Sequence, residues 1–237
     1  MISVRTKLYF SMENLILQQF FVFTFSERHD KMCSYLYFSF LRGQTMDSNF
    51  FALISRMRYI ARWGLMRNAL PENIQEHSHM VAVLAHALGV IRRDIFHQPC
   101  DVNALATAAL YHDASEILTG DLPTPIKYHN AEIMSAYHAV EDLAVQKLLG
   151  MLPPELRETY ADVLAEDKDG DIYPLVKAAD KLSAYIKCVE ELKAGNMEFK
   201  KAAEQTRRAL SEMHMPELDY FMVNCMESFS MTLDELE

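Results

Sequence analysis

The sequence predicts an all-α protein built around one main domain. From Ser48 onward, apolar residues recur every three or four positions, which is the spacing of one face of an α-helix. No run of useful length alternates apolar and polar residues as a half-buried β-strand does. Half of the 237 residues are hydrophobic, and glycine and proline are scarce, so the chain can bury one sizeable core.

About eight helices are expected. The first includes Phe50, with Ser48 as its N-cap, and ends before Gly64. The second covers 72–95 and is apolar over most of its surface, so we expect it to be central. Asp101 is well placed to cap the third, over 102–118.

Prolines and a Gly-Asn pair mark the remaining helices. Proline fits the first turn of a helix, and glycine commonly follows its end. These helices are expected at 128–149, 154–165, from Pro174 to before Gly195, 197–213 and 216–228.

Residues 1–45 differ in composition from the rest. They hold seven of the thirteen Phe residues, and five Lys or Arg against three Asp or Glu. Their apolar run at 15–25 is too short to cross a bilayer, and no small-residue cleavage site follows it. Met46 begins a stretch typical of a protein start. We therefore expect an atypical extension over 1–45, from a misassigned start or disorder, and one folded domain over 46–237.

Charge and cysteine content narrow the partners and the compartment. The formal net charge of −10 argues against a broad grip on a nucleic-acid polymer or a membrane, since both need clustered Lys and Arg. The four cysteines lie at 33, 100, 188 and 225 and form no CxxC pair. We expect them to be reduced, in a cytoplasmic protein.

The stretch YHDASEILTGDLPTP, residues 111–125, carries the densest group of polar residues. His112, Asp113 and Glu116 can reach one region of a helix surface, and several alanines precede them. Imidazole nitrogen and carboxylate oxygen together suit a first-row divalent metal. The other interpretation is a polar helix end bonded to backbone, and this stretch alone does not exclude it.

Further ligands must come from other helices. His77 and His79 are two positions apart, about 200° around a helix, so they cannot face one metal, and periodicity does not choose between them. Asp180 lies beside an apolar stripe of its helix, where a carboxylate is costly unless it is paired. It is either a metal ligand or part of a structural ion pair.

In order along the chain, these residues resemble the H…HD…D signature of the HD-domain metal phosphohydrolases. RWGLMRN, ENIQEHS, YHDASEILTGDLPTPIKY, VKAADKLSAYIKCVEEL and DYFM together resemble the bacterial 5′-deoxynucleotidases of the YfbR type. The resemblance runs from about Phe50 to Leu236 and excludes residues 1–45. It implies a single HD-domain helical bundle with a metal site between its central helices.

The resemblance also implies a role for each site residue. One divalent cation, Co²⁺, Mn²⁺ or similar, would be bound by His77, His112, Asp113 and Asp180, so His77 is selected over His79. Glu116 and Arg62 would be catalytic. The substrate would contact Arg62, Trp63, Asp113, Asp121, Leu122, Pro123, Thr124 and Asp180.

Phosphate chemistry agrees with these roles. A metal activates water and polarises a phosphoryl oxygen, while the planar fork of Arg62 matches phosphate. Glu116 can move a proton to or from the reacting groups, and Asp121 can accept a hydrogen bond from the sugar 3′-hydroxyl. Trp63, the only Trp, either walls off the sugar or anchors the core.

The expected function is metal-dependent hydrolysis of deoxyribonucleoside 5′-monophosphates to deoxynucleosides and phosphate. One alternative is hydrolysis of another nucleotide, an alarmone or a cyclic dinucleotide, although Ile117 departs from the HDxxED pattern of alarmone hydrolases. Another is a non-catalytic nucleotide sensor. The family suggests a homodimer, with Phe221 and Met222 available for an interface.

Overall fold

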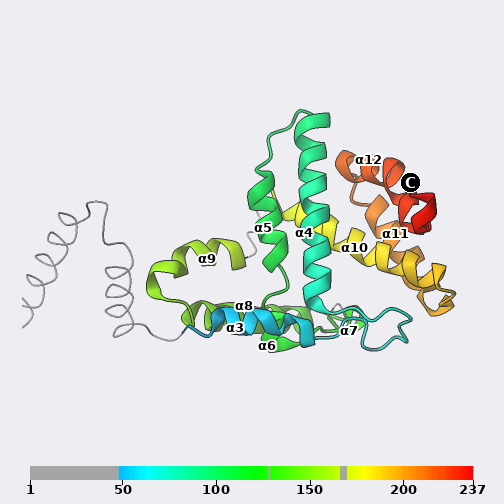
Figure 1. Cartoon of the computed structure of the whole chain (residues 1–237). Coiled ribbons are helices and arrows are strands. Elements are labelled where there is room, and N and C mark those ends of the chain that lie inside the picture. Colours follow the sequence, from blue (N-terminus) through cyan, green and yellow to red (C-terminus); the bar gives the residue numbers. More distant parts are fainter. Residues whose placement is uncertain (1–47, 128, 166–169, 237) are drawn as a thin grey trace, which may run out of the picture. The chain divides into compact units, whose positions relative to one another are not determined.

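The structure is a computed structural model that describes residues 48–127, 129–165 and 170–236, with only the backbone of Thr124 and Pro125. Within these ranges the secondary structure is helical, and the one β-type pairing is an isolated antiparallel bridge between Ala61 and Asn73 (Figure 1). The all-α prediction is confirmed. Residues 1–45 lie outside the described ranges, so the proposed extension stays a prediction.

The first helices differ modestly from expectation. Helix α3 (Phe50–Ile54) continues as a 3₁₀ turn, η1 (Ser55–Tyr59), and the helix ends there rather than near Gly64. Helix α4 (Ile74–Val90) is extended by a π-helical turn, η2 (Ile91–Ile95). The segment between η1 and α4 is therefore a long loop, and it carries Arg62 and Trp63.

The prediction of one continuous helix over 102–118 is wrong. Helix α5 (Val102–Tyr111) ends, a turn covers 112–115, and the short α6 (Glu116–Thr119) follows. Backbone bonds from Ala114 N to Tyr111 O (2.9 Å) and from Glu116 N to Asp113 O (3.0 Å) tighten the chain there. Because of this turn, the polar cluster lies at the end of a helix.

The other helices follow in the expected order. After α7 (Thr124–Lys127), α8 (Ala131–Gly150) and α9 (Arg157–Leu164) comes the long α10 (Tyr173–Lys193). A 3₁₀ turn, η4 (Met197–Phe199), then leads into α11 (Lys200–Ser211). The last elements are α12 (Pro216–Asn224), η5 (Met226–Ser230) and η6 (Leu233–Glu235).

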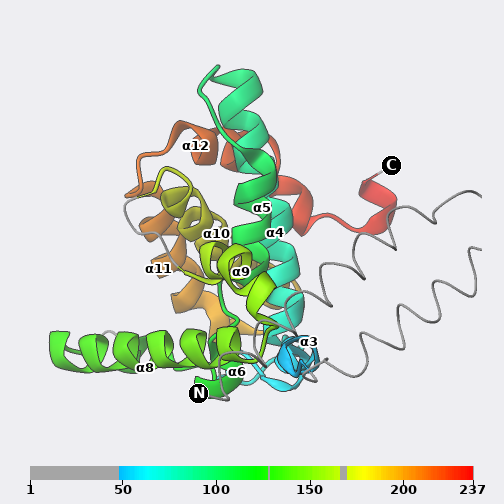
Figure 2. The ribbon, with the colours of Figure 1, turned by 90° about the vertical axis from the view of Figure 1, so that its left-hand side faces the viewer.

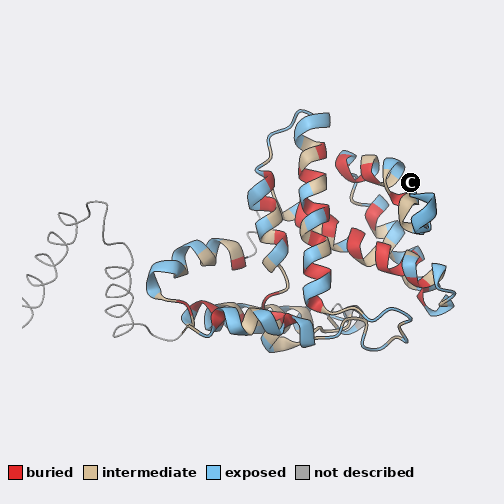
Figure 3. Cartoon of the chain, viewed as in Figure 1, coloured by how far each residue is buried: buried red, intermediate tan, exposed pale blue. Residues whose placement is uncertain are grey.

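Helix α4 lies at the centre, as expected, and packs against both α5 and α10. Buried residues run along its faces, including Val81, Leu84 and Leu88 (Figure 3). A Cβ added at Gly89 would lie 2.8 Å from Val102 and 2.9 Å from Leu105, so glycine lets α4 and α5 approach closely. The main core thus holds α4, α5 and α10 in fixed positions.

Helices α4 and α5 run in opposite directions, so the start of α4 and the end of α5 lie at the same end of the pair (Figure 1). Helices α6, α7 and α8 lie at this end, with α8 crossing the direction of α4 in both views (Figure 2). Helix α8 contacts α6, α7 and α9. A second apolar cluster joins its C-terminal part to α3, including Phe50, Leu148 and Leu152.

Among the described residues, no helix has the length and the apolar character needed to cross a membrane.

Candidate functional site

His77 is fixed at the start of α4. A capping box begins this helix: Asn73 accepts from the Glu76 N–H (3.1 Å), and Glu76 accepts from the Asn73 N–H (3.3 Å). His77 therefore lies in the first turn, with a fully buried side chain, whereas His79 is exposed. The structure places His77, and not His79, in the site.

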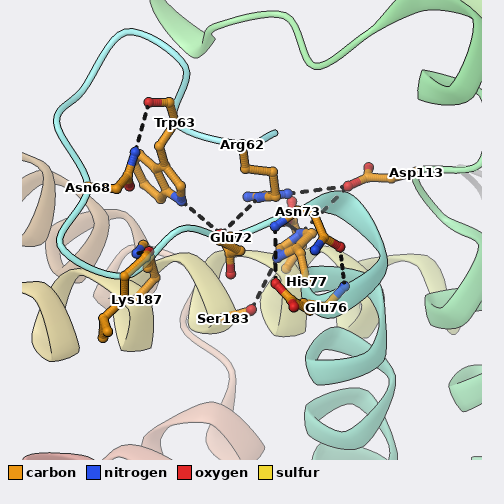
Figure 4. Close-up of polar contacts among 12 residues, drawn as sticks. Arg62, Trp63, Asn68, Glu72, Asn73, Glu76, His77, Asp113, Ser183 and Lys187 are labelled. Atoms are coloured by element: carbon orange, nitrogen blue, oxygen red, sulfur yellow. Dashed lines mark hydrogen bonds and ion pairs between the residues drawn. The ribbon is translucent and has the colours of Figure 1, made fainter. Parts of the chain in front are cut away.

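Asp180 on α10 meets His77 across the interface between the two helices. His77 Nε2 lies 3.1 Å from Asp180 Oδ1. Its Nδ1 lies 3.2 Å from Ser183 Oγ (Figure 4). Ser183 is one helical turn beyond Asp180, so both reach the same imidazole. This contact is compatible with both interpretations of Asp180, a metal ligand and a structural ion pair.

The turn after α5 lets two adjacent side chains point to one place. In a regular helix, side chains of consecutive residues diverge by about 100°. Here Asp113 Oδ2 lies 3.2 Å from His112 Nε2 and 3.6 Å from His77 Nε2. The break in the expected helix therefore brings His112 and Asp113 together at the start of α4.

The four side chains fit a divalent metal. Donor atoms of His77, His112 and Asp180 lie within 4.8 Å of one another, and Asp113 Oδ2 lies beside both imidazoles. His112 Nδ1 is 2.7 Å from the Ala109 carbonyl, which can only accept, so Nδ1 carries the proton and the buried Nε2 offers its lone pair. Among the described residues this Nε2 makes no hydrogen bond, although Asp113 Oδ2 lies 3.2 Å from it.

The charges of the cluster favour the ligand forms of the carboxylates. Burial alone would raise the pKa values of Asp113 and Asp180. His112 instead holds the pKa of Asp113 well below the usual range, and His77 does the same for Asp180. Burial, aided by the charge of Arg62, lowers the pKa of His77. Burial also opposes the charged form of His112, yet Asp113 beside it raises the pKa of His112 overall. Two nitrogen and two oxygen ligands of this kind suit a first-row transition metal.

Glu116 lies at the start of α6, one turn from Asp113. Its side chain is buried, and its Oε2 has no hydrogen-bond partner among the described residues. Burial, together with the negative charges of Asp113 and Asp121, raises the pKa of Glu116 to about 10. In the metal-free protein this environment therefore favours the protonated form, which a group that gives a proton to a leaving oxygen requires.

Arg62 reaches the cluster from the loop after η1. Its Nη1 lies 3.4 Å from Asp113 Oδ2, and its Nε donates to Glu72 Oε2 at 3.2 Å. Although burial opposes the charge, Asp113, Asp180 and Glu72 raise the pKa of Arg62. A guanidinium has five N–H donors and these contacts use two, so donors are left for an anionic substrate.

Trp63, next to Arg62, has a left-handed backbone with φ of 58°. For a bulky residue this costs on the order of 1–3 kcal/mol and persists only where neighbours determine it. Its ring packs 5.3 Å from that of Phe199, and its Nε1 donates to Glu72 Oε2 at 2.9 Å. Trp63 thus packs against Phe199, in agreement with the interpretation of a core anchor. It also donates to Glu72, the carboxylate that binds Arg62.

The loop after α6 lies beside these residues. The pKa of Asp121 is raised by burial. The charge of Arg62 and a hydrogen bond from the Trp63 backbone lower it, but burial has the larger effect. Leu122 and Pro123 are half-buried. The side chain of Thr124 lies outside the described residues, so its expected contact with substrate stays a prediction.

Two residues of the site were not singled out from the sequence. Ser183 could have been found, because it follows Asp180 by three positions on the same helix. Glu72, which accepts from both Arg62 and Trp63, gave no sequence signal, because the contact depends on how the loop folds back.

Comparison with known proteins gives one family. Residues 49–229 match the model of the family described as 5′-deoxynucleotidase YfbR-like. The chain is 49% identical over 191 residues to a 5′-deoxynucleotidase of Cronobacter sakazakii, covering 80% of this chain and 96% of the relative. It is 47% identical over 190 residues to 5′-deoxynucleotidase yfbR of Photorhabdus temperata, with the same coverage.

Solved structures support the fold. An HD-domain phosphohydrolase from Listeria innocua is 24% identical, with a TM-score of 0.68 over 76% of this chain and 88% of that one. A cyanophage S-2L HD phosphohydrolase, solved with dA and one catalytic Zn²⁺, is 25% identical, with a TM-score of 0.50 over 75% of this chain and 96% of that one.

Proposed function

This chain belongs to the YfbR-like family of 5′-deoxynucleotidases, and on that premise we propose how its site works. The protein is a phosphoric monoester hydrolase that converts deoxyribonucleoside 5′-monophosphates to deoxynucleosides and phosphate. The observation that carries the proposal is the convergence of His77, His112, Asp113 and Asp180 beside Arg62.

The four converging residues would hold one divalent cation. When bound, such a cation polarises a phosphoryl oxygen and lowers the pKa of a coordinated water. Ser183 orients the His77 imidazole, and the Ala109 carbonyl orients that of His112. Support for a metal comes from this donor set and from the Zn²⁺ in the cyanophage phosphohydrolase. Co²⁺ and Mn²⁺ also suit two nitrogen and two oxygen ligands.

Arg62 and Glu116 are the proposed catalytic residues. The remaining donors of Arg62 bind phosphoryl oxygens and stabilise their charge in the transition state. Water supplies the new oxygen of the released phosphate as the bond between phosphorus and the 5′-oxygen breaks. Glu116, whose protonated form is favoured by burial and two neighbouring carboxylates, donates its proton to that 5′-oxygen and regains one from the attacking water. A free nucleoside then leaves with a neutral 5′-hydroxyl.

The nucleoside is proposed to lie between the Arg62–Trp63 segment and the loop after α6. Asp121 is close enough to Arg62 and to the Trp63 backbone for their interactions to alter its pKa. Its carboxylate can accept from the sugar 3′-hydroxyl, while Trp63, Leu122, Pro123 and Thr124 line the rest. Asp113 and Asp180 contact the phosphate group of the substrate. A wall formed this close to the sugar would select deoxyribose by excluding a 2′-hydroxyl.

The test is a substrate screen. The purified protein, loaded in turn with Co²⁺, Mn²⁺ and Zn²⁺, is assayed for phosphate release from deoxyribonucleoside and ribonucleoside 5′-monophosphates, an alarmone and a cyclic dinucleotide. Turnover of deoxyribonucleotides above the others supports the proposal. Faster turnover of an alarmone or a cyclic dinucleotide supports the other enzyme class, and binding without turnover supports a sensor.

Two further proposals concern the state of the protein in the cell. The described cysteines Cys100, Cys188 and Cys225 are free thiols, which suits the reducing cytoplasm. A homodimer is proposed from the family resemblance. Phe221 does not serve its interface, because it is buried in the core, and Met222 is half-buried. Light scattering on the purified protein measures the oligomeric state.

A further inference from the structure

The loop between η1 and α4 is closed by its own backbone. Ala61 and Asn73 form an antiparallel bridge, Arg62 N donates to Glu72 O (3.0 Å), and Ile74 N donates to Ile60 O (3.0 Å). Backbone bonds of this kind do not require a particular side chain at position 72. The carboxylate of Glu72 is therefore not needed to bring the two ends of the loop together.

The outer part of the loop has separate anchors. Glu191 accepts from the backbone N–H groups of Ala69 (2.8 Å) and Leu70 (3.0 Å), and Lys187 donates to the Leu70 carbonyl. Glu198 binds Arg67 through its backbone N–H (3.2 Å) and its Nε (3.0 Å). None of these contacts involves Glu72.

The Glu72 side chain instead binds two consecutive side chains of the proposed site. Its Oε2 accepts from Arg62 Nε at 3.2 Å and from Trp63 Nε1 at 2.9 Å (Figure 4). Only 15% of the Glu72 side chain is exposed, and 13% of that of Arg62. One partly buried carboxylate oxygen thus fixes both groups through charge-assisted hydrogen bonds.

We propose that Glu72 is a positioning residue that holds Arg62 and Trp63 as one unit against Asp113. This rests on the proposed function, in which Arg62 binds phosphate and Trp63 lines the sugar. Arg62 is held at Nε by Glu72 and at Nη1 by Asp113, so its fork has a single orientation. Glu72 also holds the indole, and thereby determines where the sugar wall stands relative to the phosphate.

Two consequences follow for catalysis. Without the carboxylate, Arg62 keeps its contact with Asp113 but loses the one that fixes its stem, so phosphate binding in the transition state weakens. Trp63 keeps its packing on Phe199 but loses its in-plane anchor, so discrimination between deoxyribose and ribose falls. Glu72 therefore affects both kcat/KM and the ratio of deoxyribonucleotide to ribonucleotide turnover.

The test compares Glu72→Ala, Glu72→Gln and Glu198→Ala in the full chain. Glu198 is the matched control, because it anchors the same loop by a carboxylate but touches neither Arg62 nor Trp63. Both donors bind the same oxygen of Glu72, so the single carbonyl oxygen of a glutamine can accept from both. Thermal melting of each variant shows that it is folded.

The expected kinetic result is graded. Glu72→Ala lowers kcat/KM for a deoxyribonucleoside 5′-monophosphate by roughly tenfold to a hundredfold and reduces the preference over the ribonucleotide. Glu72→Gln keeps at least about one third of the wild-type kcat/KM, since it retains the acceptor. Glu198→Ala stays within about twofold of wild type, as surface pairs contribute little.

A second readout follows Trp63 directly. Trp63 is the only Trp in the chain, so tryptophan fluorescence, excited selectively over tyrosine, reports its environment alone. Glu72→Ala is expected to shift its emission to longer wavelength, whereas Glu198→Ala leaves the emission unchanged. An active wild type whose Glu72→Ala variant keeps its kinetics, or loses no more than Glu198→Ala, overturns the inference. A wild type that is inactive on every nucleotide overturns the proposed function itself.

Discussion

His77 Nε2 lies 3.1 Å from Asp180 Oδ1, although 103 residues separate them in the sequence. The contact joins the first turn of α4 to the middle of α10, the two helices that share the main core. Because packing of this core fixes both helices, the two donor atoms are held in place before any ligand binds. Preorganisation of this kind reduces the cost of forming a metal site.

Replacing Asp180 by Asn tests the ligand role of the carboxylate. Asn keeps the shape but removes the charge, so we expect affinity for Co²⁺ or Zn²⁺ to fall at least about a hundredfold, with activity falling in parallel. Isothermal titration calorimetry on chelator-treated protein measures the affinity. Unchanged metal binding by a folded Asp180→Asn variant would show that Asp180 is not a ligand.

Ser183 tests the support of His77 separately from the ligands. Its hydroxyl lies 3.2 Å from His77 Nδ1, so Ser183→Ala frees the imidazole to rotate. We expect metal affinity to fall by about tenfold to a hundredfold, which is typical of lost support around a ligand. Elemental analysis after dialysis at graded metal concentrations gives the occupancy, and equal occupancy in wild type and Ser183→Ala contradicts the assignment.

Glu116→Gln separates proton transfer from metal binding. Gln fits the same buried space but cannot donate the carboxyl proton, so kcat should fall by about a hundredfold or more while metal content stays at the wild-type level. Steady-state kinetics and elemental analysis on one preparation measure both. If turnover at neutral pH persists in this variant, Glu116 does not transfer the proton.

The raised pKa of Glu116 predicts a pH dependence of stability in the metal-free protein, which the same variant tests. Burial, Asp113 and Asp121 raise the folded-state pKa of Glu116 from 4.5 to about 10. A raised folded-state pKa contributes stability that is present below the unfolded value and is lost as pH rises between the two. The glutamine of Glu116→Gln does not ionise, so this variant does not lose stability in this way. Its melting temperature should exceed that of wild type by a margin that grows from about pH 5 to about pH 9. A margin that shrinks over this range contradicts the burial of an ionisable Glu116.

Local signals in the sequence were enough to place most helices. Asp101 caps α5, accepting from the N–H groups of Asn103 (3.1 Å) and Ala104 (2.9 Å), and Pro216 begins α12. Such caps act within a few residues, so sequence alone can identify them. The central position of α4 likewise follows from its apolar composition.

Long-range geometry was harder to predict from the residues. Periodicity could not choose between His77 and His79, because each shares a helix face with apolar neighbours, and only the family resemblance did so. The turn at 112–115 was missed, since alanines before it favour a continuous helix and only tertiary contacts reward the break. The role of Glu72 depends on a backbone bridge between distant ends of a loop, for which no local pattern exists.

The central claim is that this site, in which His77, His112, Asp113 and Asp180 would hold one metal beside Arg62, hydrolyses deoxyribonucleoside 5′-monophosphates. The most direct test measures phosphate release from dAMP and AMP by protein stripped with a chelator and titrated with Co²⁺. We predict no turnover in the stripped protein, activity that rises until one metal is bound per chain, and a higher kcat/KM for dAMP than for AMP. Turnover by the stripped protein, or equal kcat/KM for dAMP and AMP, would contradict it.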